Sequence, residues 1–281
     1  MISYHSIENN MSFWQVILRA DASERMAAED ASFAAMRDMY RAMKRADAEY
    51  DKTLKSPSGL SGGDGEKMRK YNKDGKNLCG LFMGLAMEKA IKMGESNACM
   101  KRIVAAPTAG SCGVIPAVFL AYEECFNVPE DKIVKAMFVS AGVGAVIAEN
   151  ASIAGASGGC QAEIGSASAM AAAGLAYLEG GDAECISHAM AFALKNMLGL
   201  TCDPVCGLVE VPCIKRNSAG AVNAISSAQM AMAGIRSAIT PDEVIDSMRR
   251  IGNELPVCLK ETGEGGLAVT PSALKIKERL N

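Results

Sequence analysis

The sequence has 281 residues, of which 49% are hydrophobic, and its formal net charge at pH 7 is −3. This length allows one large domain or two smaller ones with a sizeable core. The Lys and Arg clusters are interleaved with acids, so the sequence gives no sign of a nucleic-acid footprint.

Helical periodicity runs through most of the chain, and few β-branched runs alternate as strands do. It occurs in residues 27–54, 78–94, 114–126, 132–155, 166–180, 186–199, 221–235 and 241–252. It breaks at residues 56–68, which contain four glycines and one proline. Before the last segment, Thr240 offers a cap and Pro241 suits the first turn. We therefore predict an all-α protein, a compact helical domain with Gly-rich loops.

Charge is spread unevenly along the chain. Residues 103–213 carry 14 charged side chains in 111 positions, and the other 170 positions carry 47. The low-charge block is expected to form the buried centre. We predict an N-terminal helical segment at 1–57 and a catalytic domain at 58–281, packed together as one unit.

The N-terminus lacks the basic flank and apolar run of a signal peptide, so we expect a cytoplasmic protein. The uncharged stretch from Ile103 to Tyr122 has the length of a membrane span. It also contains Pro107, Pro116 and several glycines and hydroxyl residues. We therefore expect a buried loop and helix, and no membrane partner.

Ten cysteines in a cytoplasmic chain are expected to be mostly reduced thiols. Cys202, Cys206 and Cys213 follow a C-x3-C-x6-C spacing, which matches neither a zinc ribbon nor a ferredoxin run. Spacing alone supports only a dispersed site. Zinc, an iron–sulfur cluster and ordinary packing all stay open at this point.

Four segments carry a resemblance to a known family. They are SGLSGGDGEK, PTAGSCGVIPAV, ENASIAGASGGCQAEIGSASAMAAAGL and DPVCGLVEVPCIKRNSAGAVNAI. In this order they resemble the α chain of bacterial iron–sulfur-dependent L-serine dehydratase, from about Ser58 to Ser272. The resemblance implies that Cys160, Cys202 and Cys213 hold a 4Fe–4S cluster, and it leaves Cys206 to packing.

The resemblance also implies a reaction and a partner. Three thiolates on a four-iron cluster leave one iron open, and an open iron can act as a Lewis acid on the hydroxyl of L-serine. The expected products are pyruvate and ammonia, with no pyridoxal phosphate. The family has a β portion with a catalytic motif that this sequence lacks, so a β chain is the expected partner.

Two groups of polar residues flank the predicted ligands. In PTAGSCG, Thr108, Gly110 and Ser111 could bind the substrate carboxylate, although helix capping would use the same groups. After Cys213, Arg216 and Asn217 could reach the same site, although a surface ion pair would also explain an arginine there.

Glu163 follows Cys160 in an apolar stretch. Burial could raise the pKa of its carboxyl enough for acid–base catalysis. The same side chain could instead brace the loop. We therefore name Glu163, Arg216 and Asn217 as candidate catalytic residues.

Three alternatives remain at this point. A related lyase could act on another small amino acid, such as L-cysteine, with the same cluster. A non-catalytic iron–sulfur protein would bind the cluster without turnover. A zinc protein would be colourless.

Overall fold

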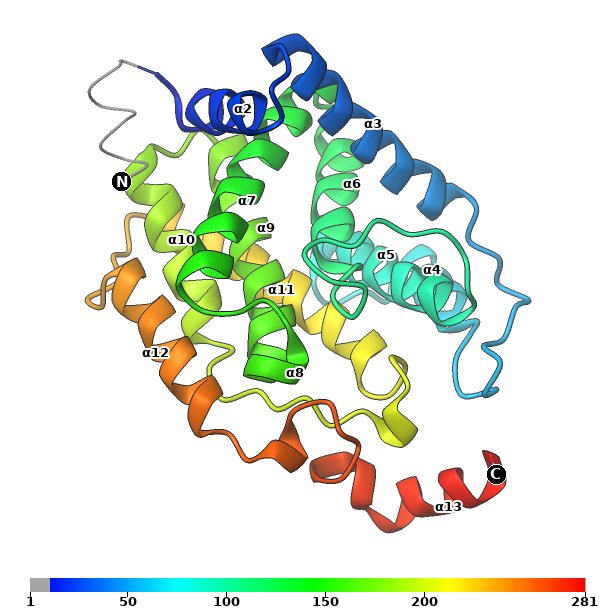
Figure 1. The fold of residues 1–281 in the computed structure, drawn as a ribbon. Coiled ribbons are helices and arrows are strands. Elements are labelled where there is room, and N and C mark those ends of the chain that lie inside the picture. The colour runs from blue at the N-terminus through cyan, green and yellow to red at the C-terminus, as the bar shows by residue number, and fades with distance from the viewer. Residues whose placement is uncertain (1–10, 281) are drawn as a thin grey trace.

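Helices provide the regular structure of residues 11–280, the part of the chain that the computed structural model describes (Figure 1). They are α2 (Phe13–Glu24), α3 (Glu29–Ala48), α4 (Asp64–Lys73), α5 (Gly80–Ala98), α6 (Val114–Phe126), α7 (Glu130–Asn150), α8 (Gly155–Gly158), η1 (Gln161–Gly165), α9 (Ser166–Leu178), α10 (Ala183–Lys195), η2 (Val205–Gly207), α11 (Cys213–Met232), α12 (Pro241–Glu254), η3 (Val257–Leu259), η4 (Gly266–Val269) and α13 (Pro271–Leu280). Within these residues, β pairing is limited to one isolated bridge, between Cys202 and Lys260. The predicted all-α class is confirmed.

Helix α9 lies at the centre and packs against α6, α7, α10 and α11 (Figure 1). Its sequence, SASAMAAAGLAYL, is made mostly of small residues. Every residue of this helix except Tyr177 is buried. Small side chains let the surrounding helix backbones come close. Ser140 on α7 donates a hydrogen bond to the Met170 carbonyl (2.7 Å), and Ser168 donates one to the Gly220 carbonyl on α11 (2.9 Å). The low-charge block is therefore the buried centre, as expected.

Local sequence signals set several helix ends. Thr240 and Glu243 form a capping box at the start of α12, with Pro241 at the first position. Helix α6 begins at Val114 and ends at Phe126, as the periodicity predicts.

For Ile103 to Tyr122 the expected loop and buried helix are present, although the loop is buried only from Ser111 to Gly113. Helix α7 is, by length and composition, the one described helix that could cross a membrane. Because 61% of its apolar window is buried inside the protein, it has the character of a core helix.

Side chains from both predicted parts share the core. Tyr40 and Met43 of α3 lie in one apolar cluster with Phe119 and Phe138. The division at residue 57 itself stays a prediction. The first ten residues of the predicted N-terminal segment lie outside the described ones.

The short elements gather at the end of the bundle away from α2 and α3. Helix α8, the segment through η2, the start of α11 and the segment through η3 and η4 meet there (Figure 1). All three predicted cysteine ligands lie on these elements.

Candidate functional site

Three separate segments bring the predicted cysteine ligands together. Cys160 lies between α8 and η1, Cys202 lies in the segment between α10 and η2, and Cys213 is the first residue of α11. Their exposed fractions are 2%, 3% and 8%. The thiols are close enough that ionisation of Cys160 or Cys213 would raise the pKa of Cys202.

Burial is the main effect on the protonation of these thiols, and it outweighs the opposing effect of the nearby Arg216 guanidinium on Cys160 and Cys213. It is the main cause that raises the pKa of Cys160 to about 11 and that of Cys213 to about 12. The pKa of Cys202 is raised further, again mainly by burial. Thiolates in this pocket therefore need a positive partner.

The donor set fits an iron–sulfur cluster. Thiolates are the soft ligands that such clusters use, and each thiolate binds its own iron. No three His, Cys, Asp or Glu side chains among residues 11–280 converge closely enough to share a single metal ion. The three buried thiols supply the kind of donors that an iron–sulfur cluster uses.

Arg216 touches the segments around all three cysteines. It lies three residues after Cys213, so both belong to the first turn of α11. Its Nη1 donates to the Thr201 carbonyl (2.8 Å), and its Nη2 lies 2.9 Å from Oδ1 of Asp203. The guanidinium also lies beside the thiol of Cys160, whose pKa it lowers against the larger effect of burial. These contacts favour a positioning role for Arg216.

Residues 257–269 form hydrogen bonds with Cys202 and with the residue that follows it. The Cys202 N–H donates to the Leu259 carbonyl (2.9 Å), and the Glu261 N–H donates to the Cys202 carbonyl (2.7 Å). The Leu267 N–H donates to Oδ2 of Asp203 (2.9 Å). The backbone on both sides of Cys202 is therefore fixed.

Glu163 lies between two glycine-rich loops. Its position comes from η1, a π-helical turn that leads directly into α9. Its Oε1 accepts a hydrogen bond from Thr108 Oγ1 (2.7 Å), and burial is the largest cause of its raised pKa. A Cβ atom added at Gly110 would lie 3.0 Å from Oε1. One added at Gly155 would lie 2.8 Å from Oε2 and 3.1 Å from Cys202 Sγ. Because neither glycine has a side chain, the Glu163 carboxylate fits between them.

The other predicted polar residues brace the PTAGSCG loop. Asn217 is 1% exposed; its Nδ2 donates to the carbonyls of Gly110 (2.8 Å) and Cys213 (3.0 Å), and its Oδ1 accepts from the Gly113 N–H (2.8 Å). Ser111 is fully buried, and its hydroxyl lies 3.0 Å from that of Thr108. The contacts of Asn217 and Ser111 thus favour bracing over contact with a substrate.

Sequence reasoning missed three residues of this site. Asp203 pairs with Arg216, Gly155 makes room for Glu163 and Cys202, and Glu261 bonds to the Cys202 backbone. Only Asp203 had a usable signal, because an acid directly after a predicted ligand is well placed to orient a nearby arginine. No pattern in residues 257–269 indicates that they reach Cys202.

Comparison with known proteins places this chain in a family. The family model described as serine dehydratase alpha chain matches residues 8–268. The chain belongs to the serine dehydratase alpha chain family. It is 51% identical to the probable L-serine dehydratase, alpha chain, of Bacillus subtilis (strain 168) over 225 residues, which are 80% of this chain and 75% of that protein.

Two further members of the serine dehydratase family extend the comparison. The L-serine dehydratase, alpha chain, of Peptoniphilus asaccharolyticus is 46% identical over 215 residues, covering 76% of this chain and 74% of that protein. The L-serine dehydratase 1 of Escherichia coli (strain K12) is 43% identical over 182 residues, covering 64% of this chain but 40% of that protein. The stated resemblance to the α chain is confirmed.

Proposed function

We propose that this chain is the α subunit of an L-serine ammonia-lyase that converts L-serine to pyruvate and ammonia in the cytoplasm. Family membership gives the reaction class. The observation that carries the proposal is the meeting of three buried thiols, Cys160, Cys202 and Cys213, from three segments. We assign these thiols as the ligands of a 4Fe–4S cluster.

When bound, the cluster supplies a Lewis-acidic iron to which the hydroxyl of serine can bind, which makes hydroxide a better leaving group. Loss of the α-proton and of hydroxide gives aminoacrylate, which becomes an imine and is hydrolysed to pyruvate and ammonia. The water released in the first step equals the water consumed in the last, so the net reaction splits serine into these two products.

The chain's own residues give the pocket both a hydrogen-bond donor and a carboxylate, which suit the two charged groups of a zwitterionic amino acid. The Thr108 hydroxyl lies beside Gly110, whose N–H makes no hydrogen bond to any described residue. The free Gly110 N–H suits the carboxylate of serine, whereas the hydrogen of the Thr108 hydroxyl is donated to Glu163 Oε1. The Glu163 carboxylate beside them suits the ammonium group. Ser111 and Asn217 then hold the loop in place, and Arg216 orients the cysteine segments.

The α chains of the curated relatives imply a second subunit. We propose that a β chain docks near the cysteine segments and completes the catalytic groups. The group that accepts the α-proton is then either Glu163 or a group of the β chain, and mutagenesis of Glu163 distinguishes the two.

The test is anaerobic purification with iron and sulfide analysis, followed by pyruvate assays with and without the β chain. A brown protein with about four irons that forms pyruvate from L-serine only with its partner supports the proposal. Cys160→Ala, Cys202→Ala and Cys213→Ala should lose both cluster and activity, while Cys206→Ala keeps both. A colourless chain in which no cluster can be reconstituted contradicts the cluster assignment. Faster turnover of L-cysteine than of L-serine contradicts the assignment of L-serine as the substrate.

A further inference from the structure

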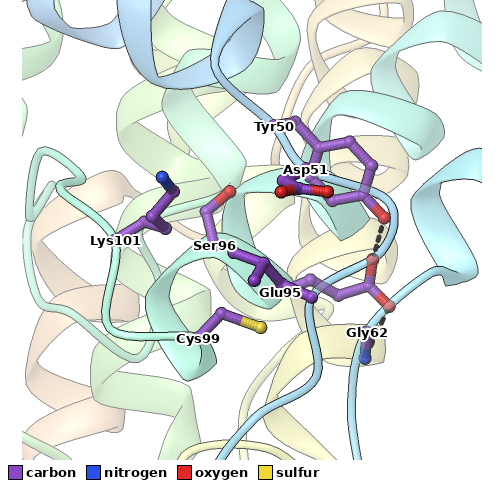
Figure 2. Close-up of a pocket in the computed structure, with 8 residues that line it drawn as sticks. Tyr50, Asp51, Gly62, Glu95, Ser96, Cys99 and Lys101 are labelled. Atoms are coloured by element: carbon purple, nitrogen blue, oxygen red, sulfur yellow. Dashed lines mark hydrogen bonds between the residues drawn. The ribbon is translucent and has the colours of Figure 1, made fainter.

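A serine- and glycine-rich loop, residues 54–65, connects α3 to α4 and lies outside the cysteine pocket described above. One buried carboxylate holds its C-terminal end. Glu95 on α5 is 1% exposed and accepts hydrogen bonds from the N–H groups of Gly62 (3.2 Å), Asp64 (2.8 Å) and Gly65 (3.0 Å). Figure 2 shows its carboxylate between the Tyr50 hydroxyl and the Gly62 nitrogen. This end of the loop is therefore fixed to α5.

A second buried carboxylate, Glu210, holds the N-terminal end of the loop. Its Oε2 accepts from Ser56 Oγ and its Oε1 from Ser58 Oγ, each at 2.7 Å. The two hydroxyls in turn accept the N–H groups of Ser61 (3.2 Å) and Leu60 (3.1 Å). Because an ionised carboxylate can only accept hydrogen bonds, both serine hydroxyls donate to Glu210. Two acceptor oxygens are needed at position 210, and only a carboxylate supplies both.

Glu210 also belongs to the segment that leads into Cys213. Its carbonyl accepts the Ile214 N–H (3.1 Å), so it caps the first turn of α11. The Val205 N–H donates to the Val211 carbonyl (2.9 Å) and closes the loop between them. A shift of Glu210 would therefore move the turn that carries Cys213 and Arg216.

We propose that Glu210 is a positioning residue for Cys213, held in place by Ser56 and Ser58 of the serine- and glycine-rich loop. This inference rests on the proposed function in one respect, that Cys213 is a cluster ligand. Glu210 is 6% exposed and Ser56 is 4% exposed, so water does not replace their hydrogen bond. The loop thus acts on the site through Glu210, from a point 154 residues away in the sequence.

The test compares Glu210→Gln with the double variant Ser56→Ala/Ser58→Ala, which keeps Glu210 and removes its donors. Glu123→Gln is the matched control, because Glu123 also accepts two side-chain hydrogen bonds, from Tyr40 (2.9 Å) and Lys44 (3.0 Å), at a site on α6. The reconstituted full chain is challenged anaerobically with an iron chelator. Separately, alkylation of Cys213 in the cluster-free chain is followed by peptide mass spectrometry.

We expect Glu210→Gln and the double serine variant to lose iron about tenfold faster than wild type, as for other residues that orient metal ligands. Both should also alkylate faster at Cys213, while Glu123→Gln matches wild type. Wild-type rates in Glu210→Gln, or equal acceleration in Glu123→Gln, overturn the inference. If Glu210→Gln does not fold, the double serine variant decides. If the wild-type chain takes up no cluster, the proposed function fails and the Cys213 alkylation rates still decide the role of Glu210.

Discussion

Arg216 and Asp203 form an ion pair between a part-buried and a buried side chain, with Arg216 Nη2 2.9 Å from Asp203 Oδ1 and side chains 16% and 5% exposed. Asp203 directly follows Cys202, and Arg216 lies in the first turn of α11 with Cys213. The same guanidinium lies beside the thiol of Cys160. One ion pair thus connects the three cysteine segments.

Breaking this pair should destabilise the chain. Asp203→Asn leaves the Arg216 charge buried without its partner, so we expect the free energy of unfolding to fall by about 3–5 kcal/mol. Urea unfolding of the cluster-free chain measures this loss. The double variant Asp203→Asn/Arg216→Met should regain part of it, and strictly additive losses would show that the two side chains are not coupled.

The sequence allowed prediction of elements whose signals are local. Thr240, Pro241 and Glu243 lie together in the sequence, and they form the cap of α12. Helix α6 likewise follows from its own apolar run. Such features need no knowledge of distant segments.

Contacts between distant segments could not be predicted in this way. The three proposed cysteine ligands rest on a family resemblance, since their spacing leaves several kinds of site open. The backbone pairing of Cys202 with Leu259 and Glu261 joins two segments that lie far apart in the sequence, and no pattern in either segment encodes it. Arg216 was expected near the site, but its engagement with Asp203 and the Thr201 carbonyl depends on the tertiary structure.

Gly155→Ala should disturb the site with little effect on the rest of the fold. The added Cβ would meet Glu163 Oε2 at 2.8 Å and Cys202 Sγ at 3.1 Å, so both groups must move. Because displacement of reacting groups by about 1 Å can cost on the order of 100-fold in rate, we expect kcat/KM for L-serine to fall by about 10- to 100-fold. Steady-state kinetics with the β chain present measure this.

Gly144→Ala on α7 is the control for that variant. Its Cβ would also make close contacts, 2.7 Å to Cε and 2.9 Å to Sδ of Met170, but the methionine side chain is flexible and can move aside. We expect its activity to match wild type. Equal activity in the two alanine variants would show that Gly155 does not set the position of Glu163 and Cys202.

Glu88→Gln should change how stability depends on pH. Burial raises the pKa of the Glu88 carboxyl above its usual value of 4.5, although Asn72 and two lysines oppose the effect. An acid whose pKa is raised by folding contributes its full stability below its unfolded pKa and loses it as pH rises through its folded pKa. The variant should therefore gain stability relative to wild type as pH rises above the usual glutamate pKa of 4.5. Urea midpoints at several pH values check this, and a constant difference would contradict it.

Thr108→Val should test the hydrogen bond between Thr108 and Glu163 in the pocket. Valine keeps the shape of threonine but cannot donate the 2.7 Å hydrogen bond to Glu163 Oε1. Loss of this donor leaves the part-buried Glu163 carboxylate free to shift from its place beside Gly110, so we expect kcat/KM for L-serine to fall by up to about 100-fold. Thr108→Ser keeps the hydroxyl and should retain most of the activity. If valine and serine behave alike with the β chain present, the Thr108 hydroxyl has no part in binding or turnover of the substrate.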